Sequence, residues 1–325
     1  MPRTLVVIPC DDPFMIAGSD HLDRLREVAE VIVFDDTPRD VEEQICRVEA
    51  ADCVINSRGH LKWPADVLKQ VPQLRMITTC SIGVDSIDLD AAAALGVTVS
   101  NVPGRTAQIV AEHALALMLG VARRLAFTTA AVRNGQWVTP DNTVLRGKTL
   151  GVIGTGAIGR EMIALGKAIG MQVQAWTFNP TAERSRQLGV PFVAFDRLLA
   201  TSDVVSLHVK LTPDSRRLLG AEQFAQMKRG SLLVNTARGP IVDTRALADA
   251  LHSGQLGGAA IDVFDQEPIT PDNPLLDCEH VVLTPHTADQ NADGRDLLNS
   301  GAVENVLAFL QGTPQNVVNQ PHGGA

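Results

Sequence analysis

Short apolar runs alternate along the chain with segments in which apolar residues recur every three or four positions. The runs are typical of buried β-strands, and the recurring positions are typical of helices packed on a sheet. In the first hundred residues this alternation predicts repeated β–α units, which indicate a parallel, doubly wound sheet. The predicted strands are Leu5–Ile8, Val31–Phe34, Cys53–Ile55, Leu74–Thr79 and Val97–Val99, and the predicted helices are Asp20–Ala29, Val41–Val48, Ala65–Lys69 and Leu89–Leu95.

The alternation resumes after a long apolar helix, predicted over 106–124, and a polar, turn-rich segment at 134–147. A final helix, Asp289–Leu310, is expected to return to the first domain, and the polar tail from Pro314 is expected to be frayed. The other predicted strands are 150–153, Gln172–Trp176, Val204–Leu207, Ser231–Asn235, Gly258–Ile261 and Val281–Leu283, and the other predicted helices are Glu183–Leu188, Arg197–Ala200, Glu222–Met227 and Asp243–His252.

Three glycines follow the strand at 150–153 with the spacing G-x-G-x-x-G: Gly154, Gly156 and Gly159. A helix and the strand Gln172–Trp176 come next, and this context favours a dinucleotide-binding turn. There the first glycine makes the turn, the second admits a pyrophosphate, and the third lets helix and strand pack closely. The helix N-terminus attracts the phosphates. The alternative is a glycine-rich β–α turn in another kind of α/β protein.

Composition and charge narrow the possible partners. The chain has 325 residues, enough for two domains, and a formal net charge of −9, which argues against nucleic acid or an anionic membrane as the main partner. Five scattered cysteines, without metal-ligand spacing, indicate reduced thiols in a cytoplasmic protein and no metal site. The apolar run at the N-terminus is too short for a signal peptide. The apolar helix near 107–121 contains Glu112 and His113, which favours a buried helix over a membrane span.

Charged residues follow three predicted strands of the second domain. Arg238 comes after Ser231–Asn235, Glu267 after Gly258–Ile261, and His286 after Val281–Leu283. In open α/β sheets ligands bind beyond the carboxyl ends of the strands, so these residues are expected on the same rim as the glycine turn. An arginine fork suits a carboxylate, and a histidine beside a glutamate can exchange the proton of an alcohol. Each residue alone could instead be a helix cap, a solvated acid or a rim histidine.

These features occur within a longer series of motifs, and the chain resembles the D-isomer-specific 2-hydroxyacid dehydrogenases over nearly its whole length. The resemblance implies hydride transfer between NAD(P)H and a small 2-keto acid or D-2-hydroxy acid of the glyoxylate or hydroxypyruvate type, with Arg238, Glu267 and His286 as catalytic residues. It also implies a cytoplasmic homodimer joined through its cofactor domains. The motifs are SIGVDSID, NVPGRTAQIVAEHALALML, LGVIGTGAIGRE, VSLHVKLTPDSRRLL, LLVNTARGPIVD, AIDVFDQEP and LTPHTA.

The expected architecture is therefore a Rossmann cofactor domain, residues 102–287, and a flavodoxin-like substrate-binding domain, residues 1–101 plus 288–325. Together the glycine turn, the residues after Trp176 and the resemblance give the expected contacts. Substrate contacts are expected at Arg58, Gly59, Ser81, Ile82, Gly83, Arg238 and His286, and cofactor contacts at Thr106, Gly154, Gly156, Ala157, Ile158, Gly159, Thr177, Asn179, His208, Ala237, Arg238, Asp262, His286 and Ala288.

The sequence departs from the usual NAD pattern at the end of the second strand of the cofactor domain. Thr177 stands where an acidic residue normally binds the ribose, so no acid repels a 2′-phosphate, and Thr177, Asn179 and Arg184 could bind one. We therefore expect NADP slightly more than NAD, with an unselective ribose site and a solvated Arg184 as the alternative. A dinucleotide-sensing corepressor and a formate- or phosphite-type dehydrogenase remain alternative functions on the same fold.

Overall fold

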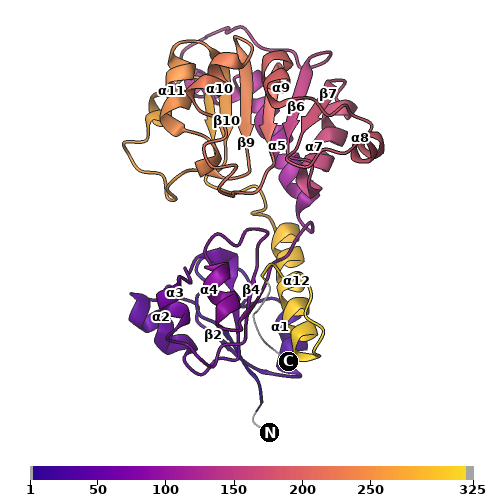
Figure 1. Cartoon of the computed structure of the whole chain (residues 1–325). Helices are drawn as coiled ribbons and strands as arrows, with labels where there is room; N and C mark the ends of the chain where they lie inside the picture. Colours follow the sequence, from indigo (N-terminus) through magenta and orange to yellow (C-terminus); the bar gives the residue numbers. More distant parts are fainter. Residues whose placement is uncertain (1–2, 320–325) are drawn as a thin grey trace. The chain divides into compact units, whose positions relative to one another are not determined.

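The computed structural model describes residues 3–319 and divides into two compact units, each an α/β domain (Figure 1). The first unit contains Met1–Thr106 and Gln290–Ala325, and the second contains Ala107–Asp289. The boundaries lie close to the ones expected at 101/102 and 287/288. The predicted fold class, two doubly wound parallel sheets, is confirmed.

The first unit contains a five-stranded parallel sheet in the order β2-β1-β3-β4-β5, which is the flavodoxin-like order. In such a sheet the order reverses next to β1, so β1 and β3 flank the position where ligands usually bind. The loops after β1, β3 and β4 all lie at this carboxyl edge. The strands are β1 Leu5–Ile8, β2 Glu30–Val33, β3 Cys53–Asn56, β4 Met76–Thr79 and β5 Thr98–Ser100.

Short helices connect these strands, and two of them begin at an aspartate that caps the helix. Asp40 accepts a hydrogen bond from the Glu43 N–H, and Asp88 accepts one from the Ala91 N–H. The first helix is shorter than the predicted Asp20–Ala29, because a tight turn at its end leads directly into β2. The helices are α1 His21–Arg26, α2 Val41–Val48, η1 Ser57–Gly59, α3 Ala65–Leu68 and α4 Leu89–Ala94.

The C-terminal segment also belongs to the first unit. Helix α12 (Ala292–Leu310) is capped by Asn291, and its buried Leu298, Val303 and Val306 join the same apolar cluster as residues of β1, β3 and β4 (Figure 1). The expectation of a frayed tail was wrong for residues 316–319. Val317 pairs with Ser100, and the Val318 N–H donates to the Val99 carbonyl, so this segment extends the edge of the sheet beside β5. The Gln315 carbonyl also accepts a hydrogen bond from the Ser100 hydroxyl, and residues 320–325 of the tail lie outside the described residues.

The second unit contains a six-stranded parallel sheet in the order β11-β10-β9-β8-β6-β7. Beyond β7 a single parallel bridge joins Ala175 to Phe192. With that bridge counted as a reduced third strand, the order is 3-2-1-4-5-6-7, which is the 3-2-1-4-5-6 of dinucleotide-binding folds with β11 added at one edge. The order reverses beside β6, which is followed by the glycine turn. The strands are β6 Thr149–Ile153, β7 Gln172–Trp176, β8 Val204–Leu207, β9 Ser231–Asn235, β10 Leu256–Ile261 and β11 Val281–Leu283.

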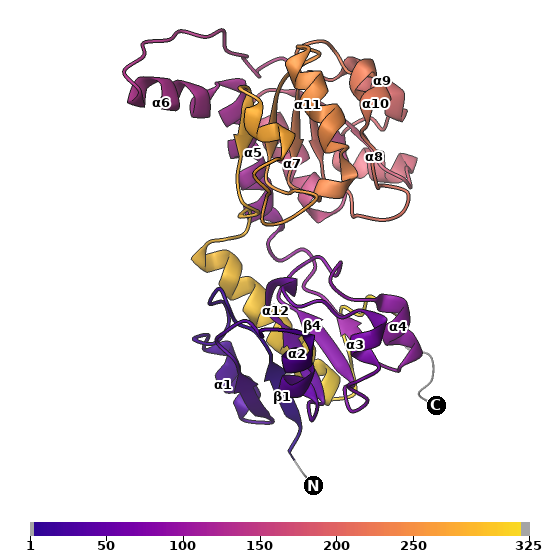
Figure 2. The same ribbon diagram turned by 90° about the vertical axis from the view of Figure 1, so that its left-hand side faces the viewer.

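Helices cover both faces of this sheet (Figures 1 and 2). Two apolar clusters result, one containing residues of α9, α10 and α11 and the other residues of α5 and α7. The helices are α5 Ala107–Ala122, α6 Leu125–Arg133, α7 Ala157–Ala168, α8 Ala182–Leu188, α9 Phe195–Thr201, α10 Ala221–Gln226, η2 Gly239–Ile241, α11 Thr244–His252 and η3 Pro274–Asp277.

Helix α6 was not predicted, and Figure 2 shows it projecting from the body of its unit. Of the residues of α6 only Ala131 is buried, whereas Leu125 and Val132 are more than half exposed. The apolar residues of α6 therefore do not follow the spacing typical of a helix packed on a sheet. Within residues 3–319 no single helix is both long and apolar enough to cross a membrane. Helices α5 and α6 meet such a criterion only as a pair bent by 60°.

Candidate active site

The glycine turn connects β6 to α7, and each of its glycines meets a different requirement. Gly154 has φ +97°, and a Cβ there would lie 2.6 Å from the His208 carbonyl. A Cβ on Gly159 would lie 2.0 Å from the Gly154 oxygen. Gly156 is the N-cap of α7, makes no side-chain cap, and has open space within 4 Å of a Cβ. The first and third glycines are therefore required by packing, and the second leaves the first N–H groups of α7 accessible to a ligand.

The residues after β7 lie beside this turn. The Arg184 guanidinium donates to the Thr155 hydroxyl at 2.7 Å and to the Asn179 carbonyl at 2.7 Å, and thus links α8 to the glycine turn. Arg184 is half-buried, which contradicts the solvated position that was one alternative. Phe178 packs edge-on against Trp176. A cation of α8 is therefore held against the glycine turn, whereas the end of β7, where many NAD-binding proteins have an acid, carries Thr177.

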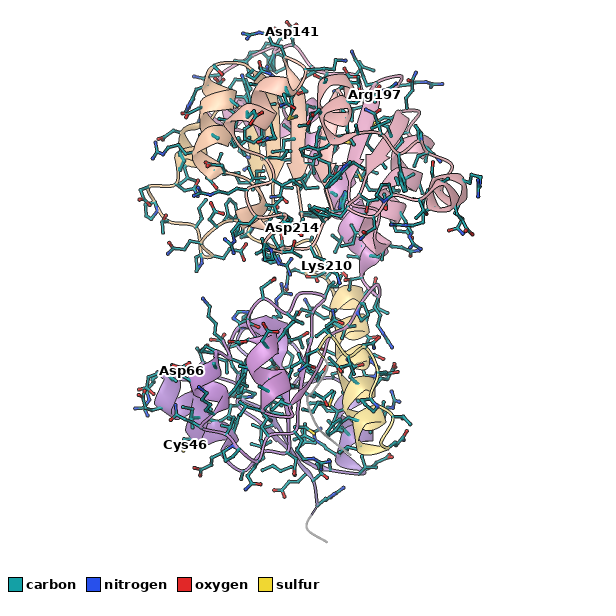
Figure 3. The ribbon with its side chains drawn as sticks, viewed as in Figure 1. Cys46, Asp66, Asp141, Arg197, Lys210 and Asp214 are labelled. Atoms are coloured by element: carbon teal, nitrogen blue, oxygen red, sulfur yellow. The ribbon has the colours of Figure 1, made fainter. Side chains whose placement is uncertain are left out.

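His208 follows β8 and packs by its backbone against Gly154. Its Nε2 lies 2.8 Å from the Ser206 hydroxyl, and its Nδ1 is buried and without a hydrogen-bond partner among the described residues. Burial lowers the pKa of His208 from 6.5 to about 4, so the ring is neutral at pH 7. His208 therefore offers the turn a neutral polar group. Lys210, two residues later, is exposed and lies with Asp214 at the opposite end of the unit from Asp141 and Arg197 (Figure 3).

The turn after β9 presents Arg238. The buried Asn235 side chain accepts from the Ala237 N–H at 3.0 Å and donates to the Arg238 carbonyl at 3.0 Å. A Cβ on Gly239 would lie 2.0 Å from the Phe264 carbonyl carbon, so only glycine permits this turn to approach the loop after β10. The approach brings the half-buried Arg238 close enough to lower the pKa of Glu267.

Glu267 and His286 form a hydrogen-bonded pair. His286 Nδ1 lies 2.7 Å from one Glu267 carboxylate oxygen, and the other oxygen accepts from the Phe264 N–H at 2.9 Å. Burial acts to raise the pKa of Glu267, but the bonds from His286 and Phe264 and the charges of His286 and Arg238 lower it below its ordinary value. The carboxylate is therefore ionised at neutral pH and can only accept. The proton of the pair thus resides on Nδ1, and Nε2 is left for chemistry.

Asp262, at the end of β10, is fully buried, and the loop after β11 folds around it. Its carboxylate accepts from the Thr284 hydroxyl at 2.6 Å and from the N–H groups of Thr287 at 2.9 Å and Ala288 at 3.2 Å. The His286 N–H donates to the Asp262 backbone carbonyl at 2.7 Å. These contacts give Asp262 a structural task, holding the loop that carries His286. Its expected contact with the cofactor, like that of Ala288, stays a prediction.

The remaining expected residues lie in the first unit, at the carboxyl ends of its strands. Arg58 has φ +52° and Gly59 φ +69° in the turn after β3, and the Gln290 amide lies against the Arg58 guanidinium. In the loop after β4 the Ser81 carbonyl accepts from Val102 and Thr79, and the carbonyls of Ile82 and Gly83 also accept hydrogen bonds. Carbonyl oxygens would repel an anion, and here they are occupied within the unit. Thr106 is fully buried, and its hydroxyl has no partner among the described residues.

The expected residues therefore form two sets. The first unit brings together Arg58, Gly59 and 81–83. At the carboxyl edge of its sheet the second unit brings together the glycine turn and the residues Ala157, Ile158, Thr177, Asn179, His208, Ala237, Arg238, Glu267 and His286. Within residues 3–319 no group of three His, Cys, Asp or Glu side chains could hold a metal ion.

Two contributors were missed by reasoning from the sequence. Asp11, buried after β1, accepts from the backbone of residues 15–17 and from the Ser57 hydroxyl at 3.1 Å, and so holds the turn that carries Arg58. His113, treated only as an interruption of an apolar helix, contacts Thr284 at 3.2 Å and Asp262 at 3.4 Å. An aspartate after a buried strand and a histidine in an apolar helix were the only signals available.

Comparison with known proteins points to one family. Residues 115–288 match the family profile described as D-isomer specific 2-hydroxyacid dehydrogenase, NAD binding domain. A D-3-phosphoglycerate dehydrogenase of Archaeoglobus fulgidus is 41% identical over 285 residues, which cover 86% of this chain but only 54% of that protein. A glyoxylate reductase of Korarchaeum cryptofilum is 39% identical over 263 residues, 79% of either chain. The structure of a glyoxylate reductase from Paecilomyes thermophila covers 98% of this chain and 99% of its own, with 27% identity and a TM-score of 0.89.

Proposed function

Because the chain belongs to the D-isomer-specific 2-hydroxyacid dehydrogenase family, we propose that it transfers a hydride between a nicotinamide dinucleotide and a small 2-keto acid or D-2-hydroxy acid. One observation supports this reaction above the others: the 2.7 Å pair of His286 and Glu267, beside Arg238, in the unit that carries the glycine turn. A fixed cation for a carboxylate and an imidazole backed by an acid are what keto-acid reduction requires.

The chemistry of the trio follows from its contacts. Arg238 binds the substrate carboxylate through its guanidinium fork and polarises the neighbouring carbonyl. Glu267 is ionised and accepts a hydrogen bond from His286 Nδ1–H, which orients the ring. In the reducing direction His286 Nε2 then donates its proton to the alkoxide that forms, and in the oxidising direction it removes the hydroxyl proton. A bound nicotinamide supplies or accepts the hydride.

The residues around the glycine turn fit a dinucleotide. The open space at Gly156 and the uncapped N-terminus of α7 suit the pyrophosphate. Among the described residues the buried Thr236 hydroxyl and His208 Nδ1 have no hydrogen-bond partner, and a group of the cofactor is the partner we propose for each. The other proposed cofactor contacts are Thr106, Ala157, Ile158, Ala237, Asp262, His286 and Ala288. The proposed substrate contacts are the backbone N–H groups of 81–83, together with Arg58 and Gly59.

For the choice of dinucleotide we favour NADP over NAD. Arg184 is held beside the glycine turn by Thr155 and Asn179, where its charge favours a 2′-phosphate, and Thr177 brings no negative charge to oppose one. The ratio of kcat/KM for NADPH and NADH measures the preference directly. A strong preference for NADH would contradict it.

We further propose a cytoplasmic homodimer that binds neither nucleic acid nor membrane. The five cysteines are free, and burial raises the pKa of Cys53 and Cys80 to about 12, so these thiols are protonated and unreactive. The apolar side chains exposed around α6, including Leu125, Val132 and Trp137, suit contact with a second copy. Sedimentation equilibrium tests the dimer, and a monomer at micromolar concentration would contradict it.

A panel of hydride acceptors and hydride donors tests the activity. NAD(P)H oxidation is measured with glyoxylate, hydroxypyruvate, pyruvate and phenylpyruvate, and NAD(P)⁺ reduction with formate and phosphite. We expect turnover with the small 2-keto acids. Turnover only with formate or phosphite would support that alternative dehydrogenase, and tight dinucleotide binding without turnover on any compound would support the corepressor-like alternative.

A further inference from the structure

A residue of α5 contacts the loop that carries His286 and the acid around which that loop folds. His113 Nε2 lies 3.2 Å from the Thr284 hydroxyl and 3.4 Å from the nearer Asp262 carboxylate oxygen. All three residues belong to the second unit, although His113 is separated from Thr284 by 171 positions in the sequence. This contact therefore joins a helix packed on the sheet to the loop after β11.

The direction of each hydrogen bond in this cluster can be assigned. The Thr284 hydroxyl has one proton, which it donates to Asp262 at 2.6 Å, so towards His113 it can only accept. His113 must therefore carry its proton on Nε2 and donate it to Thr284 and Asp262. The same carboxylate accepts from the N–H groups of Thr287 and Ala288, so one buried acid receives donors from both ends of the loop.

His286 lies in the middle of this loop and has an unfavourable backbone conformation. Its φ is +53°, in the left-handed region that favours glycine and strains other residues. Such a conformation persists only where surrounding contacts determine it. The contacts here are the bonds of Thr284, Thr287 and Ala288 to Asp262 and the bond from the His286 N–H to the Asp262 carbonyl.

We propose that His113 is a positioning residue for the reaction: by donating to Thr284 and Asp262 it holds the loop 284–288 around Asp262 and so keeps His286 in register with Glu267. Burial acts to raise the pKa of Asp262, and the hydrogen bond from His113 is the first of the interactions that nevertheless lower it, which keeps the carboxylate ionised and able to accept every donor. The effect of His113 on turnover rests on the proposed function, whereas its effect on the position of His286 relative to Glu267 does not.

The kinetic test compares His113→Ala, His113→Gln and, as a matched control on the same helix, Glu112→Ala, whose side chain is exposed. Because glutamine can donate from its amide nitrogen, as His113 does from Nε2, it should restore the bond to Thr284. We expect His113→Ala to lower kcat about 10- to 100-fold, the usual effect of misplacing a catalytic group. The dinucleotide Kd should change less than threefold, and both His113→Gln and the control should stay within about threefold of the wild-type kcat. Equal loss in the alanine and glutamine variants, or an unchanged kcat in His113→Ala, would overturn the proposal.

A second readout does not depend on turnover. The proton that His286 Nδ1 shares with Glu267 is observed by NMR and assigned by its loss in His286→Asn. We expect its signal in the wild type and in His113→Gln, and its loss or broadening in His113→Ala. If the wild type reduces none of the keto acids but this pattern holds, the proposed function fails and the positioning role stands. If the signal is the same in His113→Ala and the wild type, the positioning role fails whatever the activity.

Discussion

Replacing each glycine of the β6–α7 turn with alanine separates packing from ligand binding. In Gly159→Ala the new Cβ would lie 2.0 Å from the Gly154 oxygen, and in Gly154→Ala it would lie 2.6 Å from the His208 carbonyl at φ +97°. Cβ atoms essentially never lie closer than 3.0 Å to such atoms, and the nearest atoms here are backbone, so the backbone must move in both variants. In Gly156→Ala nothing lies within 4 Å, and φ −70° with ψ −164° is extended backbone that alanine adopts.

The expected magnitudes differ accordingly. Overpacking costs about 1–3 kcal/mol, and the 2.0 Å contact with backbone places Gly159→Ala at the upper end, with a loss of about 2–3 kcal/mol. Gly154→Ala adds the cost of a positive φ to that of overpacking and should lose at least as much. For a domain of this size a loss of about 2–3 kcal/mol lowers the Tm by roughly 4–12 °C. Gly156→Ala should change stability by less than about 1 kcal/mol. Its methyl group lies where a pyrophosphate would approach, and losing one or two charge-assisted hydrogen bonds of about 1.5 kcal/mol each weakens dinucleotide binding about 10- to 100-fold.

Two measurements are made on each variant: the Tm without ligand and the Kd for NADH and NADPH by fluorescence titration. Gly220→Ala is the matched control, because Gly220 is also an extended N-cap glycine but belongs to α10. Gly156→Ala should match this control in Tm and differ from it in Kd. A wild-type Kd in Gly156→Ala, or a Tm as low as that of Gly159→Ala, would refute the assignment of this turn to the pyrophosphate.

Other substitutions test other parts of the site. His286→Ala should lower kcat about 10²–10⁴-fold with the dinucleotide Kd retained; an unchanged kcat in steady-state assays would remove it from the chemistry. Arg238→Lys should raise KM for the keto acid and lower kcat, because an ammonium cannot replace a bidentate fork; wild-type kinetics would contradict the carboxylate role. Arg184→Ala should raise KM for NADPH more than KM for NADH, and equal effects on the two would argue against a phosphate contact. Burial holds the pKa of His208 at about 4 in the folded chain, against 6.5 in the unfolded chain, so between these pH values the unfolded state binds more protons. The free energy of unfolding should therefore fall by up to about 3 kcal/mol as the pH drops from 6.5 to 4. His208→Gln should flatten the pH dependence of urea unfolding over that window, and parallel curves would contradict this.

Sequence patterns located the buried strands more accurately than the exposed elements. The predicted bounds of β7, β8, β9 and β11 agree with the structure because turn residues flank these short apolar runs. The third strand of the second sheet is reduced to one bridge at Phe192, too short to produce any pattern. Helix α6 gave no signal because its apolar residues face outward. The tail at 316–319 was misjudged because backbone groups and the side-chain amides of Asn316 and Asn319 hold it, and a polar sequence does not reveal such contacts.

For the candidate site, order along the chain was enough to place Arg238, Glu267 and His286 on one rim. Parallel strands end at the same edge, so residues that follow them lie near one another. The sequence could not reveal the contacts that hold these residues. The bond of His113 to Thr284, that of Arg184 to Thr155 and that of Asp11 to Ser57 connect distant positions through single side chains, and no periodicity encodes them.

The central claim is that Arg238, Glu267 and His286 serve hydride transfer between a nicotinamide and the α-carbon of a 2-keto acid. Its most direct test uses NADPH and NADH deuterated at C4 in each configuration, with hydroxypyruvate as the acceptor. We expect deuterium at C2 of the hydroxy-acid product from one of the two configurations only, at a rate that His286→Ala lowers by at least about 100-fold. Product without deuterium from either donor, or the same labelling rate in the variant, would contradict the account.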